Sequence, residues 1–170
     1  MRYAAMLKWL TRFAAAGLAV GLLSAPAALA SNGEDESAVA GVRHATAAYH
    51  DLDKAIAAGY GPLLACFDQP GVGGMGQHYV DTTRLDATIE ANNPEALVYE
   101  IDGNRLQLVA VEYIVPWTAW VPATPPQLYG RPFFSNTSLH LWALHAWIWR
   151  PNPTGMFANY NPRVKLCPGH

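Results

Sequence analysis

The stretch ALVYEIDGNRLQLVAVEYIV, residues 96–115, decides the fold class of this chain. Its two halves, residues 96–101 and 106–115, are rich in Val, Leu, Ile and Tyr, and most of these residue types favour strands. The tetrapeptide between them, Asp102-Gly103-Asn104-Arg105, has the Gly and Asn of a tight turn. The stretch therefore predicts an antiparallel hairpin, around which the rest of a sheet is expected to form.

Helical periodicity precedes the hairpin, and further strand-like segments lie on both sides of it. Apolar residues recur every three or four positions over residues 37–60, which predicts an amphipathic helix. Residues 77–80, and the apolar stretch 139–149 from about Leu144 onward, predict two more strands. The expected fold is α+β, with an N-terminal amphipathic helix packed on an antiparallel sheet of about four strands.

Three connecting segments carry other signals. Asp81 is a candidate N-cap for a short second helix over residues 82–91. Residues 67–70 are expected to form a turn. Residues 116–132 contain five prolines, which disfavour regular structure, so we expect a long loop of the kind that forms lids or binding sites.

The first residues have the pattern of a secretory signal peptide. Arg2, Lys8 and Arg12 form a basic start, residues 13–23 are mostly apolar, and the tripeptide ending at Ala30 matches a signal-peptidase site. The apolar run of about 11 residues is shorter than the roughly 20 needed to span a bilayer. We therefore expect cleavage after Ala30 and export to the periplasm or to the medium.

Cleavage would leave one mature domain, residues 31–170, with an acidic balance. The full chain has 11 Lys and Arg against 13 Asp and Glu. The only charged residues of the leader are Arg2, Lys8 and Arg12, so the net charge of the mature chain would be about −5. No basic cluster remains that would neutralise a row of phosphates, so we expect no nucleic-acid partner. We expect no transmembrane segment in the mature chain, and the sequence leaves the oligomeric state open.

Cys66 and Cys167 are the two cysteines, and both lie in the part that is expected to be exported. Disulfides form and persist in that environment, so we expect these cysteines to be bonded to each other. The bond would close a loop of about 100 residues and hold the C-terminal tail against the region after the first helix. The alternative, a thiol nucleophile at Cys66, would leave Cys167 without a partner.

The segment GVGGMGQHYV, residues 71–80, contains the glycine spacing of a dinucleotide-binding loop, but its flanks do not fit. Such a loop follows a strand and opens a helix, whereas here a turn precedes the glycines and a strand is expected after them. We expect Gly73, Gly74 and Gly76 to allow positive φ and close backbone approach in a sharp turn that aims His78 inward. The alternative is a flexible surface turn.

Glu112 interrupts an otherwise apolar strand. By simple alternation Leu108 and Ile114 share its face, so its neighbours along the strand are apolar whichever face packs inward. A buried carboxylate needs a cation, a metal or a catalytic role. The alternatives are a glutamate that faces solvent, or one that pairs with Arg131 or Arg150.

His145 lies in the apolar stretch LWALHAWIWR and completes a possible donor set with His78 and Glu112. Two imidazoles and one carboxylate hold metals in open zinc sites and in mononuclear non-haem iron sites. We predict a divalent metal site (zinc, iron or copper) at these three residues, for a metal-dependent hydrolase or oxidase or for metal handling. Glu112 would be a ligand or a catalytic base, and the roles of His50 and His140 stay open.

Trp117 and Trp120, in the proline-rich loop, support a different function. A loop of this kind over an apolar or sugar-like ligand would make a non-enzymatic binding module, although the same two residues also suit a packed lid. A third possibility is a disulfide-stapled envelope protein without a small ligand. The metal hypothesis requires convergence of the three donors, and the binding module requires a pocket lined by Trp117 or Trp120.

Several segments carry a resemblance to known sequences. The chain contains ATAAYHDLDKAIAAGY, GMGQHYV, LVAVEYIVP and HAWIWRPNPTGMF in this order. In this respect it resembles a set of small uncharacterised exported bacterial proteins, and the likeness covers nearly all of the mature chain. The resemblance implies export but no activity. His50, His78, Glu112 and His145 fall inside the shared segments, whereas His140 does not, which weakens His140 as a ligand.

Overall fold

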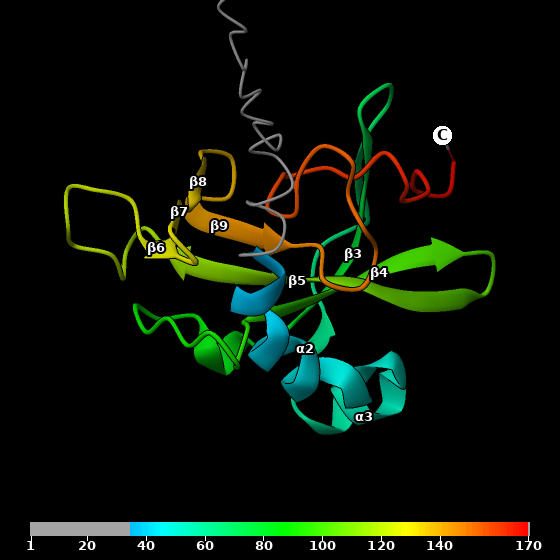
Figure 1. Ribbon diagram of the computed structural model, residues 1–170, viewed down its shortest axis with the longest axis horizontal. Coiled ribbons are helices and arrows are strands. Elements are labelled where there is room, and N and C mark those ends of the chain that lie inside the picture. The colour runs from blue at the N-terminus through cyan, green and yellow to red at the C-terminus, as the bar shows by residue number, and fades with distance from the viewer. Residues whose placement is uncertain (1–34, 170) are drawn as a thin grey trace, which may run out of the picture.

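The computed structural model describes residues 35–169, and a seven-stranded antiparallel sheet organises them (Figure 1). The strand order is β1 (Gly61–Pro62), β3 (Gly73–Val80), β4 (Ala96–Asp102), β5 (Arg105–Pro116), β9 (Leu141–Ala146) and β8 (Phe134–Asn136), and β2 (Phe67–Gln69) pairs with β3. A separate hairpin consists of β6 (Gln127–Leu128) and β7 (Arg131–Pro132). The α+β prediction is confirmed, with more strands than the four expected.

The β4–β5 hairpin forms with its predicted turn, but a β-bulge interrupts its alternation. Val98 lies opposite Ala110, whereas the next residue, Tyr99, lies opposite Leu108. The extra residue on β5 moves Leu108 to the other face of the sheet, where it packs in the largest hydrophobic cluster. The expectation that Leu108 shares the face of Glu112 is therefore wrong.

The predicted amphipathic helix is helical but not continuous. It consists of α2 (Ala40–Thr46), the 3₁₀ helix η1 (Ala47–His50) and α3 (Leu52–Ala57). Asp51 separates the last two because its backbone is extended and its carboxylate accepts a hydrogen bond from the backbone N–H of Asp53. An N-cap of this kind begins a new helix, so residues 37–60 do not form one continuous helix.

The helices cover one face of the sheet, and the main core lies between them and the strands (Figure 1). Val42 on α2 and Ala55 on α3 are completely buried in this core. The strand residues that face them are Tyr79, Leu97, Tyr99, Val111, Tyr113, Val115 and Leu144. Alternation places the neighbouring residues, including His78 and Glu112, on the opposite face.

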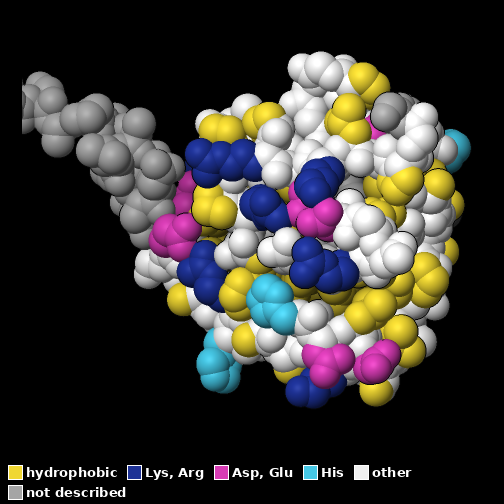
Figure 2. All heavy atoms as spheres, turned by 90° about the vertical axis from the view of Figure 1, so that its right-hand side faces the viewer, with side chains coloured by type: hydrophobic (Ala, Val, Ile, Leu, Met, Phe, Trp, Pro, Cys, Tyr) yellow, Lys and Arg dark blue, Asp and Glu magenta, His cyan; other side chains and the backbone are white. Residues whose placement is uncertain are grey.

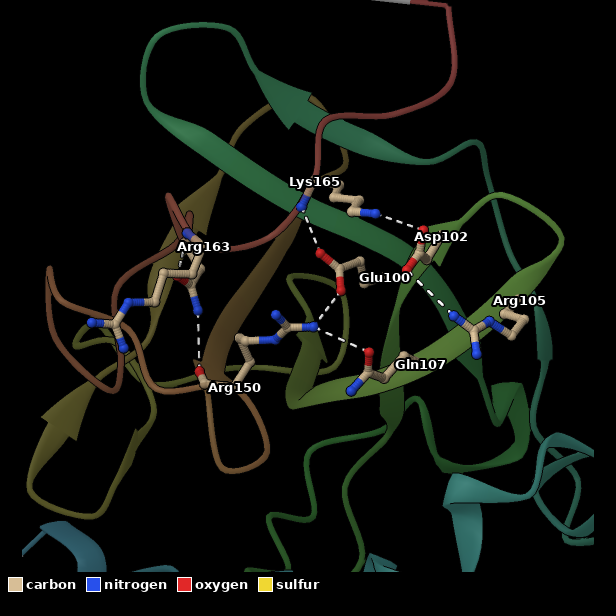
Figure 3. Close-up of polar contacts among 8 residues, drawn as sticks. Glu100, Asp102, Arg105, Gln107, Arg150, Arg163 and Lys165 are labelled. Carbon is tan, nitrogen blue, oxygen red and sulfur yellow. Dashed lines mark hydrogen bonds and ion pairs between the residues drawn. The ribbon is translucent and has the colours of Figure 1, made fainter.

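The C-terminal segment partly covers that opposite face. Glu100, a buried carboxylate on β4, accepts hydrogen bonds from the backbone N–H of Lys165 at 2.8 Å and from the guanidinium of Arg150 (Figure 3). The Lys165 ammonium also donates to Asp102 Oδ1 at 2.6 Å. Figure 2 looks onto the hairpin end of the sheet and shows basic side chains there with acidic ones between them. The hydrogen bonds from Lys165 and Arg150 to Glu100 and Asp102 fix the tail to β4.

The predicted disulfide between Cys66 and Cys167 is present. It joins the end of the tail to the chain just before β2. The backbone N–H of Cys167 also donates to Asp68 Oδ2 at 2.6 Å. The tail is thus held both covalently and by hydrogen bonds next to β2.

The glycine-rich segment is part of strand β3, so the expected sharp turn within it is wrong. The turn expected over residues 67–70 is also wrong, because most of it forms β2. The chain reverses just after β2, where the N–H of Val72 donates to the carbonyl of Gln69 at 2.9 Å. Strand β3 therefore carries His78 directly, without a loop in between.

The glycines nevertheless serve close backbone approach, as expected. Gly73 and Gly76 have positive φ values of 156° and 110°, whereas Gly74 does not have a positive φ. Gly74 exchanges two backbone hydrogen bonds with Asn161 of the tail, at 3.2 and 2.9 Å. A β-carbon at Gly76 would lie only 2.6 Å from the carbonyl oxygen of Tyr99. These positions let the tail and β4 pack against β3.

Three other expectations about elements need correction. Only Thr82–Arg84 is helical in the segment 82–91, and the Asp81 carboxylate caps it. After this helix the Asp86 carboxylate accepts a hydrogen bond from the backbone N–H of Thr88, a local contact that competes with a longer helix. The strand in residues 139–149 is β9, which begins at Leu141, before the expected start at about Leu144, and ends at Ala146. It ends there because the N–H of Trp147 donates to the carbonyl of Met156. The loop 116–132 contains the β6–β7 hairpin, which turns at Tyr129 and Gly130 with positive φ.

The expected signal peptide, residues 1–30, lies outside the described residues. Within residues 35–169, no helix is long and apolar enough to cross a bilayer. The boundary of the mature domain and its export therefore stay predictions.

Replacing Gly76 with Ala should destabilise the protein by about 3 kcal/mol. The new β-carbon would combine a left-handed backbone conformation with an overlap against the Tyr99 carbonyl. Gly61→Ala is the matched control, because its β-carbon would meet nothing within 4 Å, and it should change stability by less than about 1 kcal/mol. Urea denaturation of the two variants measures the difference, and equal stabilities would contradict this role of Gly76.

Candidate metal centre

His78, Glu112 and His145 come together on the face of the sheet that lies opposite the helices. Glu112 on β5 is directly opposite His145 on β9. Its other neighbour, on β4, is Ala96, and His78 on β3 lies opposite Val98. Because Ala96 has only a methyl group, the side chains of His78 and Glu112 can meet across β4.

The donor atoms converge as the metal hypothesis requires. His78 Nε2 lies 3.3 Å from Glu112 Oε2, and His145 Nε2 lies 3.4 Å from Glu112 Oε1. One ligand atom from each residue lies within 4.8 Å of the other two. Two ligands bound at about 2.0–2.1 Å with a tetrahedral angle lie about 3.3–3.4 Å apart. The group could therefore hold a metal ion.

All three side chains are buried, and burial controls their ionisation. Burial lowers the pKa of His78 to about 4, although the backbone of Gly76 by itself would raise this pKa. Burial and the neighbouring His78 lower the pKa of His145 to about 3. Burial, with a contribution from Glu95, raises the pKa of Glu112 to about 8. Without metal, both imidazoles are neutral and ready to ligate at pH 7, whereas the Glu112 carboxyl has to lose its proton.

Aromatic side chains pack against both imidazole rings. Phe67 meets the His78 ring edge-on, with ring centroids 5.5 Å apart, and Trp147 lies parallel to the His145 ring at 5.8 Å. Among the described residues, Nδ1 of each histidine and Nε2 of His145 have no hydrogen-bond partner. Buried polar atoms without partners are rare, and a metal ion would satisfy the Nε2 atom.

The alternatives for Glu112 do not apply in this structure. Its side chain is 8% exposed, so it does not face solvent. Arg131 pairs with Asp35 at 3.3 Å, and Arg150 donates to Glu100. Neither arginine is engaged with Glu112, whose carboxyl oxygens instead lie near the Nε2 atoms of the two histidines.

A cavity of about 140 Å³ opens beside Glu112 and His145. Its walls are mostly apolar and come from β2, β3, β8, β9 and the segments next to them. The lining residues are Phe67, Met75, Phe134, Asn136, Leu139, Leu141, Ala143, Asn159 and Tyr160, besides Glu112 and His145. A metal ion bound by the carboxylate and the imidazoles would thus border a small apolar chamber.

The other candidate residues lie outside this cluster. Trp117 packs against His140 and Trp142, and the indole N–H of Trp120 donates to the carbonyl of Thr124 at 2.8 Å. Neither Trp117 nor Trp120 lines the cavity beside Glu112, so their role in ligand binding stays a prediction. His50 contacts the ring of Trp149, with ring centroids 4.4 Å apart. Neither His50 nor His140 belongs to the possible metal-binding group.

The sequence did not identify the cavity walls. Phe67 was expected in a turn, Phe134 was not assigned to any element, and Asn159 and Tyr160 belong to the irregular tail.

Comparisons with protein-family models, with curated proteins and with solved structures give no match for this chain.

Proposed function

We propose that this protein binds one divalent transition metal ion through His78, Glu112 and His145 and keeps coordination positions open for a small molecule. The observation that carries the proposal is the convergence of two neutral imidazoles and one carboxylate in a buried patch. Such a cluster costs free energy unless something binds it, because the carboxylate is desolvated. A protein retains such a cluster for function more readily than for stability.

The donor set favours zinc, iron or copper. Imidazole nitrogen suits these metals, whereas Mg²⁺ and Ca²⁺ prefer sites made of oxygen atoms alone. Three protein ligands leave at least one position free, as in catalytic zinc sites and in non-haem iron sites. The metal would act as a Lewis acid or a redox centre on a bound molecule, for hydrolysis or oxidation, and Glu112 would act as a ligand.

Export to the periplasm or to the medium is part of this proposal. The Cys66–Cys167 disulfide supports it, since such bonds persist outside the reducing cytosol. The likeness to small exported bacterial proteins remains a prediction that agrees with it.

Elemental analysis of protein purified without chelator tests the metal site. We expect about one zinc, iron or copper ion per chain after loading and desalting. His78→Ala and His145→Ala should weaken binding by tenfold or more, because each removes a ligand. His140→Ala is the control, since His140 is exposed and outside the cluster, and it should leave the metal content unchanged. Unchanged binding in both ligand variants, or no metal in the parent after loading, would overturn the proposal.

A further inference from the structure

The chamber beside the cluster suggests which small molecule the metal would take, and this inference rests on the proposed function. Glu112 and His145 line the chamber, so a metal ion held by these residues would border it. Its volume of about 140 Å³ is close to that of an engineered protein cavity that holds one benzene molecule. The space thus admits one compact group of roughly that size.

The walls of the chamber select for an apolar group. Phe67, Leu141 and Ala143 contribute side chains from β2 and β9, and Met75 contributes from β3. At the chamber, Phe134 is 53% exposed and Leu139 is 40% exposed. Large apolar side chains exposed next to a cavity mark a binding surface more often than a structural one.

The charge of the site selects for an anion. A divalent ion with the single carboxylate of Glu112 has a net charge of about +1, since both imidazoles bind as neutral ligands. Among residues 35–169, Glu112 is the only acidic residue that lines the chamber, and no Lys or Arg lines it. Besides Glu112 and His145, the polar residues there are Asn136, Asn159 and Tyr160. A ligand with one negative charge would leave the site neutral.

We propose that the open face of the metal site takes a small organic monoanion, such as a carboxylate, whose remaining part is apolar and about as large as a benzene ring. The anionic head would bind the metal, and the ring would fill the space between Phe67, Leu141 and Ala143. A short hydrophilic acid would bind the metal through its anionic head but would not fill the apolar chamber.

Titration of the Co²⁺-loaded protein with simple acids tests this proposal, because Co²⁺ absorption reports changes in its ligands. Benzoate should bind at least tenfold more tightly than acetate, because only benzoate buries an aromatic ring. Benzyl alcohol, which has the ring but no charge, should bind at least tenfold more weakly than benzoate. The protein without metal should bind benzoate more weakly still.

Two variants locate the ring. Ala143→Leu fills the chamber and should abolish the preference for benzoate while Co²⁺ binding persists; Ala123→Leu, the same change at an exposed position, should alter neither. Phe134→Ala, at a half-exposed position, should reduce the benzoate preference several-fold.

The outcomes separate this proposal from the metal site itself. Bound Co²⁺ with no preference for benzoate over acetate, or with equal binding of benzyl alcohol, would overturn the ligand proposal and leave the metal site intact. Benzoate binding that does not depend on Co²⁺ would also overturn it. Failure of the parent protein to bind Co²⁺ would overturn both.

Discussion

Glu112→Gln is expected to stabilise the metal-free protein at alkaline pH and to remove most of its response to metal. The folded protein raises the pKa of Glu112 to about 8 from its ordinary value of 4.5. Between these values the unfolded chain releases the proton and the folded chain keeps it, so stability falls as pH rises. By pH 9 the loss amounts to roughly 4 kcal/mol, and glutamine, which does not titrate, avoids it.

Urea denaturation at pH 5 and pH 9 in the presence of chelator measures this effect. The parent should lose much more stability than the variant between the two pH values. Glu95, which burial gives a pKa of about 7, adds a separate loss with the same sign, but both proteins contain it. The difference between the two proteins therefore reports on position 112, and equal pH slopes would contradict a buried, partnerless carboxyl there.

With metal present, the parent should become more stable than the Glu112→Gln variant. At pH 7.5, with free metal at 100 times the dissociation constant, the parent should gain about 2.7 kcal/mol. The glutamine variant should gain far less at the same concentration, because a neutral amide oxygen is a poor replacement for a carboxylate ligand. Equal gains would show that Glu112 is not a ligand. This pattern is the ordinary compromise between stability and function at a binding site.

Two of the three donors were predictable because each is an energetic anomaly in its own segment. Glu112 and His145 interrupt apolar strands, and that signal is local. His78 was identified for a partly wrong reason, since the glycines before it form a strand and not a turn. What the sequence could not supply is the strand order that places β9 next to β5 and so puts His145 opposite Glu112.

The fold class was predictable for a similar reason. The β4–β5 hairpin has long apolar strands and a short turn, so local preference and tertiary packing agree. The bulge between Val98 and Tyr99 has no comparable local signal, and it makes simple alternation fail for Leu108. Face assignment by parity is therefore correct near Glu112 and incorrect four residues earlier.

The short strands and the chamber depend on long-range contacts. Strands β1, β2 and β8 have two or three residues each, too few for a periodic signal. They exist because β3 and β9 offer free edges to pair with. Since β2 and β8 supply Phe67 and Phe134, the binding chamber was as unpredictable as these pairings.

Removal of the disulfide should cause the largest loss of stability that does not involve the cluster. Cys66 and Cys167 are 101 residues apart, and closing a loop of that length restricts the unfolded chain by roughly 4–5 kcal/mol. The double variant Cys66→Ser, Cys167→Ser should lose about this amount in urea denaturation. Dithiothreitol should destabilise the parent similarly and leave the variant unaffected, which controls for other effects of the reductant.

The same variant tests whether the tail needs the bond in order to stay docked. The folded tail has other attachments: the backbone N–H of Lys165 donates to Glu100, and Asn161 exchanges two hydrogen bonds with Gly74. If these suffice, the variant should bind the same amount of metal as the parent, because the disulfide then acts mainly on the unfolded chain. A parallel loss of metal binding would show that the covalent bond also keeps the three metal-binding residues in place.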